Sequence, residues 1–427
     1  MMLTPEQEEL GRRNFMKVLA GTPALAVLGG AAFMKGPLRG GPVRVGFIGV
    51  GSEGRVLLRA TDPAFVEVRA MCDINPAQLA RADKELEQLN RPKAKHYVDW
   101  KEMLQKEDIE AVIMAPPLWM HADLAVGCLE AGKHVLCEKM MAWDVAGCER
   151  MRDAAKKNRK LLEIGYQRLY NPIYQAAHTG IIKAGVLGEV YHARVLWHRN
   201  KDWRRTDSPP TPDYDPSPWG YPTFDHLLNW RLYWKYSQGL MAELGSHQIN
   251  IVNWFFGAAP TSVIASGGVY RFKDHGREVH DHVYASFDYP GGRNAVFTSI
   301  ESNAFEDYYE MYMGTKGTLI LRSENEAMLF EEGSAARATT IEVAAKGAGP
   351  VVESTESRPP SSGAIARAGS GGDKLPKGLP YKEEVSRFCS AVRVGTPLLV
   401  GPDHAIGSAV ACIRANESVA KQQRLTI

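Results

Sequence analysis

Two residues one helical turn apart, Glu243 and His247, have side chains suited to moving a proton. An imidazole has an ordinary pKa of about 6.5, so His247 can gain and lose a proton near neutrality. If the segment is helical, the four-residue spacing places both side chains on one face. We interpret His247 as the proton acceptor and Glu243 as the group that holds its ring or acts as a partner base. A histidine that simply packs inside a helix is the alternative.

Lys139 is the third candidate because it lies just past the apolar run His134–Cys137, which has the pattern of a buried strand. A surface lysine is the ordinary alternative, but that position disfavours it. An ammonium group beside a reacting hydroxyl stabilises the alkoxide that forms as the proton leaves. Lys139, His247 and Glu243 therefore suit the oxidation of an alcohol, which needs a proton acceptor and a donor that orients the oxygen.

A dinucleotide site is indicated by Gly49, Gly51 and Gly54, which complete the pattern G-x-G-x-x-G. The apolar run 43–48 precedes the turn and a helical stretch follows it, so that a pyrophosphate can sit at the helix start. Asp73 ends the next predicted strand, at the spacing where a carboxylate binds the adenosine ribose hydroxyls. Because a carboxylate repels a 2′-phosphate, we predict NAD as the cofactor and regard NADP as less favoured.

The elements around these residues alternate between strands and helices. Strands are predicted over 66–72, 111–115 and 134–137, with helices over 76–89 and 121–131. This alternation predicts an α/β fold with a doubly wound parallel sheet of the Rossmann type over residues 42–164. Residues 165–427 would form a second domain, in which 188–197, 261–270, 280–289 and 294–301 have the pattern of strands. Residues 333–376, rich in Ala, Gly, Ser and Pro, are expected to be a mobile insertion.

The segment Ala131–Lys139 resembles the AGKHVxxEKP motif of the glucose–fructose oxidoreductase, inositol dehydrogenase and rhizopine-catabolism (Gfo/Idh/MocA) family. The resemblance extends to Gly165–Arg168, Gly188–Val190, Gly239–His247, Gly314–Leu319 and the C-terminal segment 388–427. It implies a second α/β domain with a large, open, mostly antiparallel sheet. In relatives, that sheet forms a wall of the active site and often an interface of a homo-oligomer, so we expect a dimer or tetramer.

The resemblance also implies roles for single residues. In relatives the lysine that matches Lys139 orients the substrate, and the matching region of the cofactor site includes Pro116, His121, Glu138 and Gln167. The chain departs from the family pattern at three places. Glu243 and Asn250 stand where the family has Asp, and Met140 stands where it has Pro. Asn250 cannot act as a base.

Six of the nine tryptophans lie between residues 197 and 254, interleaved with arginines and histidines. Aromatic faces and guanidinium groups suit the C–H faces and hydroxyls of a sugar. The predicted substrate residues are Arg168, Trp203, Arg204, Trp230 and Arg231. A hydrophobic plug or a subunit contact is the alternative interpretation.

Arg12 and Arg13 precede the uncharged run Val18–Met34, a pattern that resembles a twin-arginine (Tat) export signal. We expect residues 1–41 to be this signal and an arm, recognised by the Tat translocon. The protein would then be periplasmic, or held at the membrane by an uncleaved signal. A fortuitous Arg-Arg before a buried helix is the alternative. A protein exported with its nicotinamide cofactor would need to hold it tightly and restore its redox state at each turnover.

Composition excludes several other classes. A net charge of +2 gives no reason to expect nucleic-acid binding. The six cysteines form no CxxC pair and are expected to be reduced and buried. His280 and His282 lack a second cluster that would complete a metal site, so no metal is predicted.

Three hypotheses follow. The first is an exported sugar or polyol oxidoreductase with tightly bound NAD. The second is an NAD-dependent glycosidase that works by transient oxidation and elimination. The third is a cofactor-holding binding protein in which the changes at Glu243 and Asn250 have ended catalysis.

Overall fold

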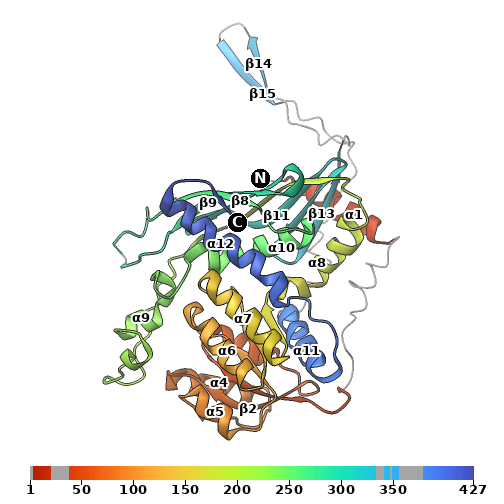
Figure 1. Cartoon of the computed structure of the whole chain (residues 1–427). Coiled ribbons are helices and arrows are strands. Elements are labelled where there is room, and N and C mark those ends of the chain that lie inside the picture. Colours follow the sequence, from red (N-terminus) through yellow and green to blue (C-terminus); the bar gives the residue numbers. More distant parts are fainter. Residues whose placement is uncertain (1–2, 21–37, 275, 333–340, 347–348, 355–377) are drawn as a thin grey trace.

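The structure of the chain, a computed structural model, describes residues 3–20, 38–274, 276–332, 341–346, 349–354 and 378–427. Within these residues the chain forms two large sheets with helices packed between and around them (Figure 1). The first sheet and its helices lie at one end of the molecule, and the second sheet lies at the other. Both sheets of the predicted α/β fold are confirmed.

The first sheet has six parallel strands in the order β3-β2-β1-β4-β5-β6. Its strands are β1 (Val43–Ile48), β2 (Val66–Cys72), β3 (Lys95–Tyr97), β4 (Ala111–Met114), β5 (His134–Glu138) and β6 (Leu162–Gly165). They alternate with α3 (Ser52–Ala60), α4 (Pro76–Gln88), α5 (Trp100–Lys106), the short helix η1 (Leu118–Met120), α6 (His121–Glu130) and α7 (Val145–Asn158). Helices on both faces bury the central strands, which explains their continuous apolar runs. In such a sheet, ligands bind at the carboxyl ends of the strands where the strand order reverses, here between β1 and β4.

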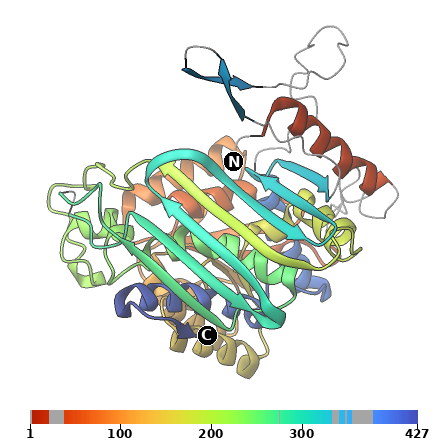
Figure 2. The ribbon, with the colours of Figure 1, turned by 90° about the horizontal axis from the view of Figure 1, so that it is seen from above.

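The second sheet has eight strands in the order β13-β12-β11-β7-β10-β9-β8-β16. They are β7 (Val190–Asn200), β8 (Ser262–Gly268), β9 (His282–Tyr289), β10 (Arg293–Ile300), β11 (Ser302–Gly314), β12 (Gly317–Arg322), β13 (Glu326–Glu331) and β16 (Leu425–Thr426). The pair β7–β10 is parallel and the other pairs are antiparallel. Seen from above, no helix crosses one face of this sheet at strands β8, β9 and β10 (Figure 2).

The opposite face of the second sheet packs on helices that join the two halves. These include η2 (Gln167–Tyr170), α8 (Pro172–Ala177), η3 (His178–Ile182), η6 (Met241–Gly245) and α10 (Ser246–Phe256). Helix α12 (Pro402–Lys421) runs between α10 and α7, and α11 (Leu379–Val394) packs on α3. Arg393 at the end of α11 forms an ion pair of 2.6 Å with Glu110 and donates to the carbonyls of Gly41 and Pro42. The C-terminal helices therefore fix the second domain against the first.

Between β7 and η6, the chain leaves the sheet and forms η4 (Ser217–Trp219), α9 (Phe224–Leu228) and η5 (Trp230–Leu232). This part lies beside the first domain (Figure 1). A later turn, η7 (Pro290–Gly292), links β9 to β10.

Helix α1 (Pro5–Ala20), which carries Arg12 and Arg13, packs along β13. Phe15 and Leu19 are buried there, and a Cβ at Gly11 would lie 2.5 Å from Phe330 Cζ. The close approach explains a glycine where an export signal usually has Ser or Thr. The expected signal continues into residues 21–37, which lie outside the described residues. Among the helices that are described, none combines the length and apolar character needed to cross a bilayer.

The predicted insertion 333–376 contains a hairpin of β14 (Ile341–Lys346) and β15 (Gly349–Ser354). The Val and Ile residues of these twelve paired positions favour strands. That the insertion is mobile stays a prediction. The other residues of the insertion lie outside the described part of the chain. All six cysteines are free and buried, as predicted.

Candidate active site

The glycine turn between β1 and α3 has the geometry that the sequence predicts. Gly49 has a φ of +79°, and a Cβ there would press on the backbone of Ala115 and Pro116. A Cβ at Gly54 would clash with the carbonyl oxygen of Gly49, so α3 approaches the turn without room for a side chain. A Cβ at Gly51 would meet nothing within 4 Å, because this glycine borders open space.

Asp73, at the end of β2, is fixed beside this turn. Its carboxylate accepts hydrogen bonds from the backbone N–H groups of Val50 (2.9 Å) and Asn75 (2.8 Å). Burial raises the pKa of Asp73 to about 6, while these two donors and the charge of Arg55 act in the opposite direction. The carboxyl group is thus mostly ionised at neutral pH and lies at the position predicted for the ribose contact.

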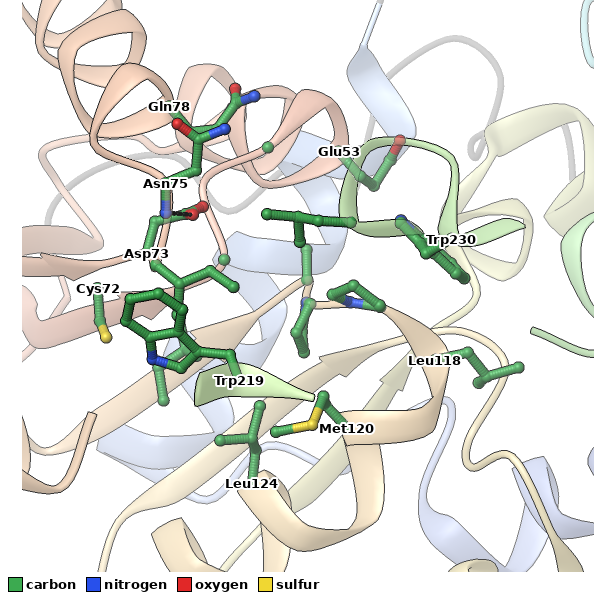
Figure 3. A pocket seen from close by; sticks show the side chains of 18 of the residues that line it. Glu53, Cys72, Asp73, Asn75, Gln78, Leu118, Met120, Leu124, Trp219 and Trp230 are labelled. Carbon is green, nitrogen blue, oxygen red and sulfur yellow. Dashed lines mark hydrogen bonds between the residues drawn. The ribbon is translucent and has the colours of Figure 1, made fainter. Parts of the chain in front are cut away.

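A cavity of about 710 Å³ extends from this turn to the end of β5 and lies between the two domains. Figure 3 shows Gln78, Asn75, Asp73 and Trp219 in that order along one side of the cavity, with Trp230 and Leu118 on the other side. The predicted residues that line the cavity are Gly49, Gly51, Asp73, Pro116, His121, Glu138, Lys139, Trp230, Arg231 and Glu243. This volume lies in the range of protein pockets for small molecules and cofactors.

Lys139 and Glu243 meet at one part of this cavity, and Arg231 joins them. Lys139 Nζ donates to the backbone carbonyl of Glu243 at 3.0 Å. The Glu243 carboxylate accepts from Arg231 Nε at 2.8 Å, and the nearby charges of Arg231 and Lys139 overcome burial to lower its pKa. The two residues that were far apart in sequence are thus brought together, with Glu243 ionised.

His247 lies at the start of α10, but Glu243 does not bind it. In the described part of the chain, no residue forms a hydrogen bond with the ring, and its buried Nδ1 has no partner. The carboxylate instead pairs with Arg231, because a guanidinium attracts it more strongly than a neutral imidazole does. Burial lowers the pKa of His247 well below its ordinary value, and the charges of Lys139, Arg168 and Arg199 lower it further. The ring is therefore neutral and able to accept a proton.

The loop after β5 is held in place by hydrogen bonds to the ring of His121. Its Nδ1 lies 2.8 Å from the Met140 carbonyl oxygen and its Nε2 lies 3.1 Å from that of Pro116. This contact fixes the backbone beside Lys139 although Met140 replaces the proline that the resembling family has. Asn250 is fully buried and donates to Ser408 at 3.2 Å, so it lies in the core and not in the cavity wall.

Comparison with known proteins assigns both halves of the chain to one family. Residues 43–166 match the family model described as "Oxidoreductase family, NAD-binding Rossmann fold". Residues 176–320 match the "GFO/IDH/MocA C-terminal domain". The chain belongs to the Gfo/Idh/MocA family. Its first domain is therefore an NAD-binding Rossmann domain.

Individual relatives agree with this assignment. Glycosyl hydrolase family 109 protein 2 of Phocaeicola vulgatus is 33% identical over 158 residues, which are 35% of this chain and 37% of that protein. The match thus spans little more than a third of that relative. The structure of levoglucosan dehydrogenase with NADH and L-sorbose has a TM-score of 0.68 at 18% identity, covering 90% of this chain and 99% of the other. A putative myo-inositol dehydrogenase from Sinorhizobium meliloti has a TM-score of 0.62 at 19% identity, with the same coverage. At these identities the structures show a common fold.

The cavity of this Gfo/Idh/MocA protein fits NAD on its own geometry. The open space at Gly51 leaves room for a diphosphate, and Asp73 is in place for the ribose. Glu138 has a buried Oε1 with no partner, and burial together with repulsion from Glu53 raises its pKa to about 8. A neutral carboxyl group there can donate a hydrogen bond as well as accept one, which suits a carboxamide such as that of nicotinamide.

Five of the residues predicted for substrate or cofactor do not line the cavity, and neither does His247. Arg168 is 1% exposed and pairs with Glu310 (2.6 Å) and Glu324 (2.7 Å), because a buried guanidinium needs anionic partners. Arg204 is bound to Asp225 at 2.7 Å. Neither these two nor Trp203, Gln167 or Gly54 lines the cavity. The roles of these residues stay predictions. For the two arginines, sequence spacing could not reveal which carboxylates they pair with.

Several residues of the cavity wall were not predicted. Arg205, Tyr221 and Trp219 belong to the aromatic stretch that we assigned to a sugar, yet Trp219 lies beside Asp73 (Figure 3). Asn75 and Gln78 begin α4 next to them. The available signal was the long connection between β7 and α9, because connections of this length inside a compact domain are usually functional.

No group of three or more potential ligand side chains for a metal occurs among the residues that the structure describes. His282 binds Asp281 at 2.8 Å, and His280 packs edge-on against Trp234. Asp281 itself accepts from the backbone N–H groups of residues 270–272. These residues therefore hold a loop together.

Proposed function

We propose that this protein is an exported oxidoreductase that uses tightly bound NAD to take hydride from a sugar or polyol and to return it. The observation that carries the proposal is the position of Lys139 in the same cavity as Asp73 and the glycine turn, with His247 within its electrostatic reach. A cation that orients a hydroxyl and a neutral imidazole that accepts its proton are what alcohol oxidation requires.

Each residue has a defined part in this chemistry. NAD supplies the hydride acceptor when it is bound. Lys139 Nζ would donate to the hydroxyl oxygen, and the developing negative charge on that oxygen would be stabilised by the ammonium group. His247 would accept the hydroxyl proton at its uncharged ring. Glu243, paired with Arg231, would hold Lys139 in place through its backbone carbonyl.

The preference for NAD over NADP is proposed from Asp73. Its carboxylate would bind the ribose hydroxyls and repel a 2′-phosphate, while Ile74 and Asn75 offer no cation to hold one. The dissociation constants of the two cofactors would measure this preference directly. Tighter binding of NADP would contradict it.

A panel of sugars and polyols tests the main proposal. The purified protein, with its cofactor verified by mass spectrometry after denaturation, is mixed with each compound, and the absorbance of reduced nicotinamide is followed. Reduction by one member, reversed by an oxidised sugar, is the expected result. No signal from any member, with NAD present at one per chain, would favour the cofactor-holding binding protein and contradict the oxidoreductase.

An NAD-dependent glycosidase is the second candidate, favoured by the similarity to glycosyl hydrolase family 109 proteins. In that chemistry, oxidation of a ring carbon acidifies the neighbouring C–H, a base removes that proton, and the glycosidic bond breaks by elimination. Water then adds, and the returned hydride restores the ring carbon. Aryl glycosides incubated without added NAD separate the two candidates, because only the glycosidase releases the phenol.

Export through the Tat translocon is proposed from Arg12 and Arg13 before an uncharged run. Cell fractionation of the protein and of a variant with Arg12→Lys and Arg13→Lys tests it. The unaltered protein is expected in the periplasm or at its membrane, and the double variant in the cytoplasm. Equal cytoplasmic amounts of both would contradict export.

A further inference from the structure

The connection from Lys201 to Thr223, which we call the crossing segment, leaves the second sheet and reaches the NAD-binding domain. Tyr214 Oη donates to the carbonyl of Ile74 at 2.9 Å, next to Asp73. Asp207 forms an ion pair of 3.3 Å with Arg81 on α4. Two points of the first domain beside the ribose carboxylate are therefore tied to a segment that belongs to the second domain.

A third contact anchors the far end of the crossing segment. Trp119 Nε1, in η1 after β4, donates to Tyr221 Oη at 2.7 Å. The rings of Trp119 and Tyr221 pack edge-to-face, with centroids 5.6 Å apart, and Tyr236 Oη donates to the Gly220 carbonyl at 2.9 Å. The crossing segment thus spans the cavity from the end of β2 to the end of β4.

Two aromatic residues of this segment, Trp219 and Tyr214, lie at the end of the cavity where the adenosine of NAD would bind. Trp219 lines the cavity, and its ring lies close to Asp73 in Figure 3. Tyr214 lies nearly parallel behind it, with the ring centroids 6.4 Å apart and the planes at 12°. A flat indole face that is backed by a second ring and borders a ribose site suits a purine base.

Arg205 brings an unpaired positive charge to the middle of the cavity. Its backbone is fixed by two hydrogen bonds with the Asn229 side chain, of 2.7 and 3.1 Å. Its guanidinium has no hydrogen bond or ion pair with any residue that the structure describes, and it lines the cavity. Burial lowers the pKa of Arg205, and the charges of Arg231 and Arg55 lower it further, whereas the carboxylates of Asp207 and Glu243 act in the opposite direction.

These neighbours indicate where along a bound dinucleotide Arg205 would lie. Arg231 is near Lys139 and Glu243, where the reaction takes place, and Arg55 is near Asp73, where the ribose binds. Between the two ends of a dinucleotide lies its diphosphate. A diphosphate would form charge-assisted hydrogen bonds with the Arg205 guanidinium, whereas Arg231 already pairs with Glu243 at 2.8 Å.

We propose that the crossing segment is a clamp by which the second domain holds NAD, with Arg205 binding the diphosphate and Trp219 covering the adenine. The ties of Tyr214 and Asp207 keep the clamp closed, so that the cofactor stays bound between turnovers. The proposal depends on the dinucleotide site and not on which carbohydrate reacts, so it can fail separately from the proposed function.

Binding measurements on full-length protein freed of cofactor test the clamp. Affinities for NAD, ADP and adenosine are compared by calorimetry for the unaltered protein, Arg205→Gln and Trp219→Ala. We expect Arg205→Gln to weaken NAD and ADP about tenfold to hundredfold and to leave adenosine unchanged. Trp219→Ala should weaken all three ligands about tenfold, whereas Trp219→Phe, which keeps a ring, should bind them nearly as well.

The rate at which bound NAD dissociates provides a second readout. Tyr214→Phe removes only the hydrogen bond to Ile74 and is expected to speed dissociation several-fold without altering the fold. Arg271→Gln is the matched control for Arg205→Gln, because this guanidinium lies over the Phe272 ring at 5.6 Å and does not line the cavity. Unchanged NAD affinity in Arg205→Gln, or a raised KM for the sugar alone, would overturn the proposal and assign Arg205 to the substrate.

Discussion

At the scale of single residues, the proposed reaction depends on a cation, Lys139, and on a neutral base, His247. Lys139 is held by the backbone of Glu243, and His247 lies among the charges of Lys139, Arg168 and Arg199. The cations keep the imidazole uncharged, and an uncharged imidazole is the form that accepts a proton. Electrostatic neighbours therefore matter to catalysis even where they do not touch the substrate.

Lys139→Ala removes the cation while leaving the cofactor site intact. We expect kcat to fall about 10²- to 10³-fold, the usual effect of removing one donor to a developing oxyanion. NAD affinity, measured by calorimetry, should stay within a few-fold of that of the unaltered protein. Equal losses of kcat and of NAD binding would instead indicate that Lys139 has only a structural role.

The pH profile reports on His247. Because its pKa is lowered, the neutral ring persists above that pKa, and kcat/KM should fall only as the pH drops well below 6.5. Arg199→Gln removes one of the charges that lower this pKa, so the acidic limb should move to higher pH. A limb at the ordinary histidine pKa in both proteins would argue against His247 as the proton acceptor.

At the scale of elements, the turn between β1 and α3 contains one glycine that folding requires and another that only cofactor binding requires. Gly54 has no room for a Cβ because of the Gly49 carbonyl, whereas Gly51 borders open space. Gly54→Ala should therefore lower the free energy of unfolding by about 1–3 kcal/mol, the usual cost of overpacking. Thermal unfolding, followed by circular dichroism, measures this change.

Gly51→Ala is the partner of that experiment. The added methyl group meets no protein atom, so the melting temperature of the cofactor-free protein should not change. The methyl group occupies space that a diphosphate needs, so the free energy of NAD binding should become less favourable by about 1–3 kcal/mol. A stable Gly51→Ala protein with unaltered NAD affinity would show that the dinucleotide does not approach this glycine.

The sequence could predict elements whose signal is local. Strands β1 and β2 were predicted with their observed bounds, because β1 reads as a mainly apolar run and β2 alternates apolar and polar residues before its buried end. Asp73 followed from its spacing to the glycine turn. The partners of Arg168, Arg204 and Glu243 could not be predicted, because the choice of ion pair depends on residues up to 156 positions away in the chain. Nor could spacing reveal that Trp219 lies beside Asp73.

At the scale of the whole molecule, we expect self-association at the face of the second sheet that no helix crosses over β8, β9 and β10 (Figure 2). Tyr191, Ile264 and Tyr284 on this sheet are between 42% and 50% exposed. Apolar side chains gathered on an open sheet favour an interface between subunits. The homo-oligomer expected from the family thus has a place on the structure and remains a prediction.

Ile264→Glu tests that prediction. A charge at the centre of an apolar interface would be buried without a partner, so the mass from light scattering should fall from that of a dimer or tetramer to that of a monomer. Val394→Glu is the control, since Val394 is 50% exposed at the end of α11, away from the sheet. A monomeric mass for the unaltered protein would contradict the interface.

The docking of α1 on β13 has a consequence for the proposed export. Arg12 lies 3.5 Å from Glu8 and 3.7 Å from Glu326, and Arg322 on β12 pairs with Glu8 at 2.6 Å. A translocon receptor that reads the twin arginines would have to compete with this strand for the same helix. The fraction of the protein that is exported would then depend on how often α1 detaches from β13. A substitution at Phe330, which is remote from the arginines in sequence, would change this fraction as much as a substitution next to Arg12 and Arg13.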